Sequence, residues 1–333
     1  MPIPSIHVAI CTYQPRPEAL RRTLEGLAAQ TLAVSDWEFT LIDNASTPAI
    51  SADDFDLSFH PRASVLREEK LGLTQARLAA IRHSKADLIL FVDDDNILAP
   101  DYLEQALLIS EKMPNLGVFG AAVIEPEFGA EPPSFLKGPD RLAMLALREE
   151  SSDLWGSTPG TSATPWGAGL VVRRELASHY QSKVESSQMR SELDRKGESL
   201  NSAGDDEFSW LGHRDLGLGH GVFRSLKMIH LIPPERLEVD YLLRLAEGHA
   251  FSRRLLHHIN QKELAVWWMP SWKLLFGGLV RSDVRWPVKL RDFLSGLSKR
   301  AEFWALGEED RALRLARMRG SQRAEKFIAD HND

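Results

Sequence analysis

Asp93, Asp94 and Asp95 directly follow five apolar residues, Leu88–Val92, which predict a strand buried on both faces. Three neighbouring carboxylates repel one another and lose hydration there unless a positive charge joins them. Oxygen ligands suit Mg²⁺ or Mn²⁺, and Mg²⁺ usually binds one or two carboxylates together with substrate phosphates. A turn or an N-cap before the next helix is the alternative, but it needs only one such side chain. The run therefore predicts a divalent-cation site and a phosphate-bearing substrate.

Alternating strands and helices must position this run. The expected strands are 6–13, 37–46, 63–69, 87–95, 116–126 and 169–173, and the expected helices are 16–32, 73–84 and 101–113. This order predicts an α/β fold with a mainly parallel sheet, whose ligands lie at the carboxyl ends of the strands. Polar residues stand at those ends: Thr12 and Tyr13, Asp43 and Asn44, and the aspartate run. We expect the functional site there.

Composition disfavours several other classes of protein. The formal net charge of −7 argues against a nucleic-acid-binding protein. Neither a Gly-x-Gly-x-x-Gly after the first strand nor a Walker-type Gly-Lys-Ser/Thr is present, which disfavours dinucleotide and P-loop sites. Cys11 is the single cysteine, so a reducing cytoplasm is expected. No leader is recognised, and no apolar run reaches the roughly 18–20 residues of a membrane span.

Helical periodicity from about residue 240 onward predicts a division into an N-terminal domain, 1–240, and a helical C-terminal region, 241–333. Aromatic and basic residues mix in the second region, and the tryptophans are Trp267, Trp268, Trp272, Trp286 and Trp304. Such helices can lie in a membrane interface, which would place the protein peripherally at the inner face of the membrane. The alternative is that these aromatic side chains pack on the N-terminal domain or in a homodimer contact.

Four segments carry a resemblance to a known family: "IHVAICTYQPRPEALRRTLEGLAAQTL", "FTLIDNAST", "REEKLGLTQARLAAIRHSKADLILFVDDDN" and "WGAGLVVRRE". Together they resemble family 2 glycosyltransferases of the GT-A fold over roughly residues 5–245. The resemblance implies a Rossmann-like, mainly parallel sheet flanked by helices, with the helices after residue 240 as an extension. It also implies that a nucleotide-diphosphate sugar lies across the strand ends, held through a metal by a D-x-D motif.

The resemblance assigns nucleotide-binding roles to residues of the first three strand ends. Thr12 and Tyr13 would line the nucleoside pocket, and Asp43 would hydrogen-bond the base. A carboxylate suits the ring N–H of uracil, so a UDP-sugar is favoured, although Asp43 could also be a turn residue. Gly72 would let the backbone approach the nucleotide. Arg77 would face the diphosphate or the base, and a solvated helix position is its alternative.

Within the D-x-D motif, Asp93 would lie near the ribose and Asp95 would bind the metal. Asp94 is assigned to nucleotide binding. The motif can be aligned with the three aspartates in more than one register, so Asp93 is also a candidate metal ligand. His230 lies about where some members place a third ligand, which would favour Mn²⁺ somewhat over Mg²⁺. A structural histidine on an apolar strand is the alternative.

The acceptor side is assigned from two later segments. Gly167 and Gly169 would leave room for the donor sugar, and Trp166 would stack on a sugar face or pack in the core. "AGDDEFSW", residues 203–210, resembles the second acidic motif of the family, in which a carboxylate removes the proton of the acceptor hydroxyl.

Asp206 fits the catalytic place in that motif, with Asp205 standing where a glutamate is usual. The last acidic position of the family motif falls on Phe208 in this chain, and Glu207 stands one residue before it. Glu207 is assigned to sugar and acceptor binding. This departure leaves the choice between Asp205 and Asp206 open. The start of a helix, where negative charge is favourable, is the alternative reading of the whole run.

The resulting hypothesis is a metal-dependent, inverting glycosyltransferase. It would transfer a sugar from a UDP-sugar to a hydroxyl of a glycan or lipid-linked acceptor, in polysaccharide or cell-envelope synthesis. A nucleotidyltransferase is one alternative, but "CTYQPRPEAL" lacks the Gly-rich, basic signature expected after its first strand. A non-catalytic sugar-nucleotide-binding protein is the other, and it would not need the second acidic run.

Overall fold

The computed structural model describes residues 5–191, 193–195, 200–201, 205–260 and 286–331. The chain divides into two compact units, Met1–Leu242 and Leu243–Asp333. The boundary expected between residues 240 and 241 falls in the first turn of helix α8 (Val239–Ile259).

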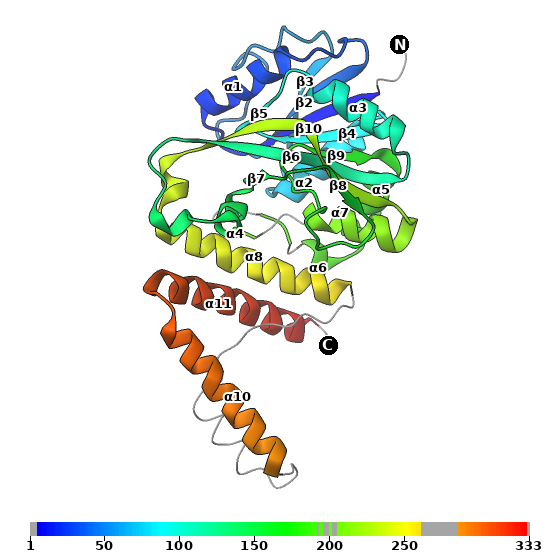
Figure 1. The fold of residues 1–333 in the computed structure, drawn as a ribbon. Helices are drawn as coiled ribbons and strands as arrows, with labels where there is room; N and C mark the ends of the chain where they lie inside the picture. The colour runs from blue at the N-terminus through cyan, green and yellow to red at the C-terminus, as the bar shows by residue number, and fades with distance from the viewer. Residues whose placement is uncertain (1–4, 192, 196–199, 202–204, 261–285, 332–333) are drawn as a thin grey trace. The chain divides into compact units, whose positions relative to one another are not determined.

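Among the described residues, ten strands form one sheet (Figure 1). They are β1 (Ile6–Thr12), β2 (Trp37–Asn44), β3 (Ala63–Glu68), β4 (Leu88–Asp93), β5 (Asn96–Leu98), β6 (Leu116–Phe128), β7 (Arg148–Glu149), β8 (Leu154–Gly156), β9 (Leu170–Arg173) and β10 (Gly219–Ile232). The order across the sheet is β3-β2-β1-β4-β9-β6-β10-β5, with β7 paired to β6 and β8 to β10. Strands β3, β2, β1 and β4 are parallel, and β9 is antiparallel to both of its neighbours. The predicted α/β fold is confirmed.

Helices cover both faces of the sheet in the first unit (Figure 1). They are α1 (Pro17–Ala28), α2 (Leu73–His83), α3 (Tyr102–Lys112), α4 (Pro139–Leu142), α5 (Arg174–Glu185), α6 (Gln188–Ser191) and α7 (Asp205–Leu211), with short turns η1 (Ser134–Leu136), η2 (Ala143–Leu145), η3 (Gly212–Leu216) and η4 (Pro234–Leu237). Helix α1 begins at Pro17, whose fixed φ suits a first helical position. It buries Leu20, Leu24 and Leu27, which recur at helical spacing.

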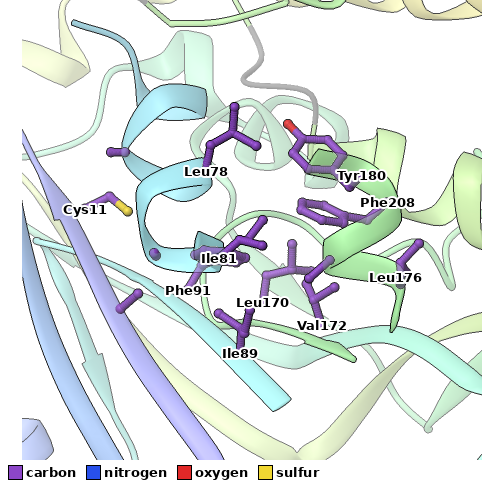
Figure 2. Packing of buried hydrophobic residues seen from close by; sticks show 14 of the residues in the cluster. Cys11, Leu78, Ile81, Ile89, Phe91, Leu170, Val172, Leu176, Tyr180 and Phe208 are labelled. Atoms are coloured by element: carbon purple, nitrogen blue, oxygen red, sulfur yellow. The ribbon is translucent and has the colours of Figure 1, made fainter. Parts of the chain in front are cut away.

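One hydrophobic layer fixes the helices that border the site. Strands β1, β4 and β9 turn alternate residues toward α2, α5 and α7, as a strand must. Figure 2 shows Tyr180 of α5 and Phe208 of α7 lying over this layer, with their ring centroids 4.1 Å apart. Phe208 also approaches Phe91 of β4, at 6.2 Å between centroids. This packing holds the first turn of α7 close to the end of β4.

The sequence did not predict strands β5, β7, β8 and β10 or the helices α4, α5 and α6. Strand β5 is only three residues long and lies between the strand expected at 87–95 and the helix expected at 101–113. Strand β10 contains Gly219, Gly221 and several polar residues, which obscure its alternation. Helix α5 follows β9 without a linker, so the strand pattern runs directly into the helical one.

The second unit contains the rest of α8 together with α10 (Trp286–Ala305) and α11 (Glu308–Asp330). Helices α8 and α11 pack where Gly320 meets the backbone of Glu247, and Arg319 pairs with the Glu247 carboxylate at 2.9 Å. No described helix is both long and apolar enough to cross a membrane. The prediction about the C-terminal tryptophans falls on side chains that lie outside the described part of the chain.

Candidate active site

The parallel strands bring the predicted polar ends together at one edge of the sheet. Thr12 of β1 stands beside Asp43 of β2, and Cys11 stands beside Asp93 of β4. The side chain of Asn44 links this edge to the start of α2, because its Oδ1 accepts a hydrogen bond of 2.7 Å from the N–H of Gly72. The strand ends, the aspartate run and the N-terminus of α2 therefore form one site.

In the aspartate run, Asp95 is buried, Asp93 and Asp94 are half-buried, and the three have different partners. The Thr12 hydroxyl donates a hydrogen bond to Asp94. Burial and the neighbouring Asp95 charge nevertheless raise the pKa of Asp94 to about 7. Burial and the charge of Asp95 likewise raise the pKa of Asp93. Two of the three carboxyl groups thus resist ionisation in the protein alone.

Asp95 is the member that the chain itself neutralises. Its Oδ2 lies 2.8 Å from Arg236 Nη1 and 3.9 Å from Arg16 Nη2, while its Oδ1 lies 3.5 Å from His230 Nε2. Burial alone would raise the pKa of Asp95, but these cationic neighbours outweigh it and hold that pKa well below its ordinary value. The β5–β10 pairing, in which Asn96 stands opposite His230, brings these residues together.

The site fits a divalent ion only in part. Among the described residues, no three His, Cys, Asp or Glu side chains gather in a geometry that could hold an ion. Asp95 and His230 are close together, but Asp93 does not complete a three-ligand set with them. The carboxylates nevertheless present the oxygen donors that Mg²⁺ and Mn²⁺ favour, and burial together with the neighbouring Asp95 raises the pKa values of Asp93 and Asp94. Substrate phosphates and water would have to supply the remaining ligands.

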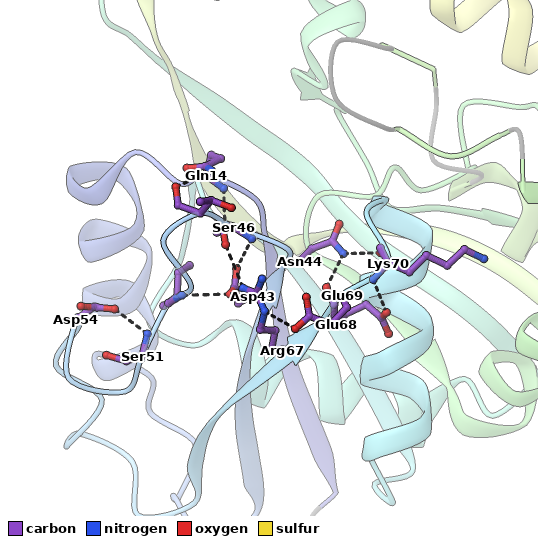
Figure 3. Close-up of polar contacts among 12 residues, drawn as sticks. Gln14, Asp43, Asn44, Ser46, Ser51, Asp54, Arg67, Glu68, Glu69 and Lys70 are labelled. Atoms are coloured by element: carbon purple, nitrogen blue, oxygen red, sulfur yellow. Dashed lines mark hydrogen bonds and ion pairs between the residues drawn. The ribbon is translucent and has the colours of Figure 1, made fainter.

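Asp43 is held firmly by its own chain (Figure 3). Its carboxylate accepts hydrogen bonds from the N–H groups of Ser46, at 3.0 Å, and Ile50, at 3.1 Å, and it pairs with Arg67 Nη1 at 2.5 Å. Burial opposes ionisation, but the hydrogen bonds from Ser46 and Ile50 and the pairing with Arg67 lower the pKa of Asp43 overall. A base would have to share this carboxylate with three internal donors. Tyr13, which follows the strand partner Thr12, is 46% exposed.

Arg77 joins the two acidic runs. It is buried in α2, lies 5.4 Å from the centre of the Phe91 ring and forms an ion pair with Asp205. Burial would lower the pKa of Arg77, but the charges of Asp205 and Asp93 raise it. Arg77 is therefore not at the solvated position that was its alternative reading, and it connects the end of β4 with the start of α7.

The predicted glycines are surrounded by the chain's own side chains. A Cβ at Gly167 would meet the carboxylate of Asp205 and, at 2.7 Å, Arg77 Nη2. A Cβ at Gly169 would lie 2.6 Å from the Tyr102 hydroxyl. Gly72 has φ of 143° and no room for a Cβ beside the carboxylate of Asp194. Close packing within the protein explains each glycine without a substrate.

The acids of the second run have different cationic neighbours. Glu207 is buried and pairs with Arg190 at 2.5 Å; burial raises its pKa, and Arg190 opposes that change. Asp206 lies within electrostatic range of Arg148, whose guanidinium stacks 4.0 Å from the ring centre of Trp166. The placement of Glu207 is that of a structural ion pair.

Sequence reasoning did not identify the arginines around these acids. They are Arg16, Arg148, Arg190 and Arg236. Each is far in sequence from the acid it faces, apart from Arg190, and no local motif marks it. A signal was present only at Arg16, which follows the end of the first strand closely.

Comparison with known proteins agrees with this architecture. The model of the family "Glycosyl transferase family 2" matches residues 7–176, which is more than half of the chain. An N-acetylglucosaminyltransferase of Bradyrhizobium diazoefficiens is 32% identical over 123 residues, covering 36% of this chain and 24% of that protein. A glucosyl-dolichyl phosphate glucuronosyltransferase of Haloferax volcanii is 26% identical over 163 residues, covering 46% of this chain and 50% of that protein. The chain thus spans between about a quarter and a half of these relatives.

Among solved structures, S. aureus TarS 1-349 in complex with UDP-GlcNAc is similar over 98% of this chain and 83% of that chain. The TM-score is 0.46 and the sequence identity is 14%.

Proposed function

The chain belongs to glycosyltransferase family 2, and we propose that it transfers a sugar from a UDP-sugar to a hydroxyl acceptor. One observation carries the proposal: Arg77 ties Asp205 to the end of β4, so that both acidic runs lie at the same edge of the sheet. The run at the end of β4 can bind the diphosphate of the donor, and the run that begins α7 can act on the acceptor. A non-catalytic binding protein would not need the second run, and a nucleotidyltransferase does not fit the family match.

The proposed step is a single displacement at the anomeric carbon. The acceptor oxygen forms a bond to that carbon as the bond to the diphosphate breaks, and UDP leaves with the electron pair. Asp206 takes the proton of the acceptor hydroxyl. Attack from the side opposite the leaving group inverts the anomeric centre. Asp205 is less suited to the proton transfer, because its carboxylate is engaged by the buried Arg77.

Asp95 and His230 would hold Mn²⁺ or Mg²⁺ together with the donor's diphosphate. The ion would supply charge stabilisation for the leaving diphosphate. Arg16 and Arg236, the other cations at Asp95, are placed to contribute positive charge at the same edge. Uridine is the favoured nucleoside in this proposal, because the Asp43 carboxylate could accept a hydrogen bond from the ring N–H of uracil.

The relatives suggest which donors to test first. Two of them are named for N-acetylglucosamine and glucuronic acid transfer, so the donor sugar varies among proteins that this chain resembles. A glycan or lipid-linked acceptor in polysaccharide or envelope synthesis is part of the proposal, as is action in the cytoplasm or at the inner membrane face.

A donor screen tests the proposal. Thermal unfolding and titration calorimetry would be carried out with UDP-GlcNAc, UDP-glucose, UDP-glucuronic acid, GDP-mannose and dTDP-glucose, each with and without Mn²⁺. We expect at least one UDP-sugar to raise the unfolding temperature, and to do so more with Mn²⁺. Binding without UDP release would indicate a non-catalytic protein. Failure of every donor to bind would overturn the proposed function.

A further inference from the structure

Tyr102 is a buried tyrosine whose hydroxyl group bonds to the backbone of a distant segment. It is the first residue of α3, and its side chain is buried completely. The hydroxyl donates a hydrogen bond of 2.6 Å to the carbonyl of Gly169, the residue that precedes β9. Burial raises the pKa of Tyr102, so the hydroxyl stays protonated and remains a donor at neutral pH. A phenylalanine would fill the same space, so packing alone does not account for the tyrosine.

The hydrogen bond holds Gly169 in a backbone conformation that favours glycine. Its φ is 65°, in the left-handed region, and a Cβ on it would lie 2.6 Å from the Tyr102 hydroxyl and 3.0 Å from Met228 Sδ. Met228 stands opposite Leu98 in the pairing of β10 with β5. The segment before β9 is therefore held between the start of α3 and strand β10.

The same segment borders the link between the two acidic runs. Gly167 lies two residues before Gly169, and a Cβ on it would meet the Asp205 carboxylate and, at 2.7 Å, Arg77 Nη2. Asp205 and Arg77 form the ion pair that connects the end of β4 with the start of α7. Because the backbone of Gly167 is already in close contact with this pair, a displaced segment would force the two side chains to move.

We propose that Tyr102 is a positioning residue for the second acidic run: its hydroxyl fixes the segment 166–169, against which the Arg77–Asp205 pair rests. This inference rests on the proposed function, in which Asp206, the next residue of α7, accepts the acceptor's proton. A proton acceptor works only at a defined distance from the reacting hydroxyl. Tyr102 acts on that distance through the backbone of the segment and not through contact with a substrate.

Two variants test the inference. Tyr102→Phe removes the hydroxyl and keeps the ring. Thr40→Val is the matched control, because it also removes one buried hydroxyl from a side chain of nearly unchanged size. Thr40 Oγ1 lies 3.0 Å from His7 Nε2 and 3.1 Å from Ser64 Oγ, and neither partner is assigned to the site. Circular dichroism and thermal unfolding would verify that both variants fold and that they lose similar amounts of stability.

The first measurement does not depend on activity. It is the hydrogen exchange of the Arg77 guanidinium N–H groups, followed by ¹⁵N NMR and assigned with Arg77→Lys. Burial in an ion pair should slow this exchange in the wild type. We expect Tyr102→Phe to accelerate it about tenfold, the size of effect that the loss of one hydrogen bond produces, and Thr40→Val to leave it unchanged. Unchanged exchange in Tyr102→Phe overturns the inference.

The second measurement is UDP release from UDP-GlcNAc with Mn²⁺ and water as the acceptor, because water also loses a proton as it attacks. We expect kcat to fall about tenfold in Tyr102→Phe with an unchanged KM for the donor, since a misplacement of about 1 Å can cost about 10²-fold. Thr40→Val should keep both wild-type values. Unchanged kcat in Tyr102→Phe would show that the hydroxyl only stabilises the fold, and a rise in KM alone would assign it to donor binding. Either result overturns the inference.

Failure of the proposed function is distinguishable from failure of this inference. A wild-type protein that binds no donor contradicts the proposed function. The exchange at Arg77 still decides whether the Tyr102 hydroxyl fixes the ion pair, because that measurement needs no substrate.

Discussion

The two acidic runs of this chain are equally long but are neutralised in different ways. In the run at the end of β4, the cationic neighbours gather on a single member, Asp95, and they are Arg16, His230 and Arg236. In the run that begins α7, two of the acids form ion pairs with different arginines, Asp205 with Arg77 and Glu207 with Arg190, and Asp206 lies within electrostatic range of Arg148. The cations of the first run therefore gather on one carboxylate, whereas those of the second run are distributed over different carboxylates.

Backbone geometry explains the difference. Successive residues on a helix turn by about 100°, so three neighbouring side chains reach three different parts of the protein. At a strand end they crowd into one place, where burial and mutual repulsion raise the pKa of Asp94 to about 7 and also raise that of Asp93. A cation from outside the chain would relieve the first run. In the second run, arginines of the chain already pair with Asp205 and Glu207.

The largest effect is expected at Asp206. Asp206→Asn should reduce sugar transfer by about 10²–10⁴-fold, because the amide keeps the shape of the side chain but cannot accept the proton. Donor affinity, measured by calorimetry with UDP-GlcNAc and Mn²⁺, should change little. UDP release and product formation measure the loss.

Asp205→Asn is the control for this prediction, since Asp205 is engaged by Arg77. It should disturb the link between the two runs and lower activity less than Asp206→Asn does. If Asp205→Asn is inactive while Asp206→Asn transfers normally, the assignment of the base is off by one residue. If both variants stay active, the acidic run is only the start of a helix.

The next effect is expected at the first run. Asp95→Ala should weaken UDP binding in the presence of Mn²⁺ by roughly 10²-fold or more, given that even residues that only support a metal ligand cost 10–100-fold. Without Mn²⁺ the variant and the wild type should bind UDP similarly. Asp53→Ala, an exposed aspartate in the turn before β3, is the control. Equal affinity of Asp95→Ala and wild type in Mn²⁺ would remove Asp95 from the metal site.

The contrast between the runs was only partly visible in the sequence. Both runs could be found because they are local, and the main strands and helices could be found because apolar periodicity is local as well. The arginines Arg148 and Arg236 could not be assigned, because only the folded chain brings them to Asp206 and Asp95. The same holds for Glu207, which was assigned to the acceptor side but lies in a buried pair with Arg190.

The glycines show a similar limit. The sequence motif indicated that small residues are required at 167 and 169, but it suggested space for a sugar as the reason. In the structure, the space beside Gly167 is filled by the Asp205–Arg77 pair and that beside Gly169 by Tyr102. Which atoms occupy such a space depends on segments far apart in sequence, so pattern alone predicts the glycine and not its cause.

A third prediction concerns the link between the runs. Gly167→Ala should destabilise the protein by about 1–3 kcal/mol, because its Cβ would overlap the Asp205 carboxylate and Arg77 Nη2 and force the pair apart. Denaturant unfolding measures the change. Gly156→Ala is the matched control, since a Cβ there meets no atom within 4 Å. Equal stability of the two variants would show that the Arg77–Asp205 pair can shift freely.

The smallest effect is expected at Arg236, and it tests whether the chain's own cations compete with a metal at the first run. Arg236 Nη1 lies 2.8 Å from Asp95 Oδ2, and its side chain is 30% exposed. An ion that binds Asp95 must share or displace this contact, so Arg236→Met should strengthen Mn²⁺ binding in the absence of nucleotide. A partly exposed ion pair is worth about 0.2–1 kcal/mol, which corresponds to an increase in affinity of no more than about fivefold.

Titration calorimetry with MnCl₂ measures this effect, and Arg21→Met, which removes an exposed pair with Glu18 on α1, is its control. Weaker Mn²⁺ binding in Arg236→Met would mean that the arginine orients Asp95 for the ion instead of competing with it. Stronger binding would mean that the protein partly neutralises Asp95 until a donor arrives. Arg236 would then be free to turn from the carboxylate to the diphosphate, since an arginine binds either oxyanion through the same N–H groups. The helical run is less open to such an exchange, because one partner of each of its ion pairs is buried: Arg77 in the pair with Asp205, and Glu207 in the pair with Arg190.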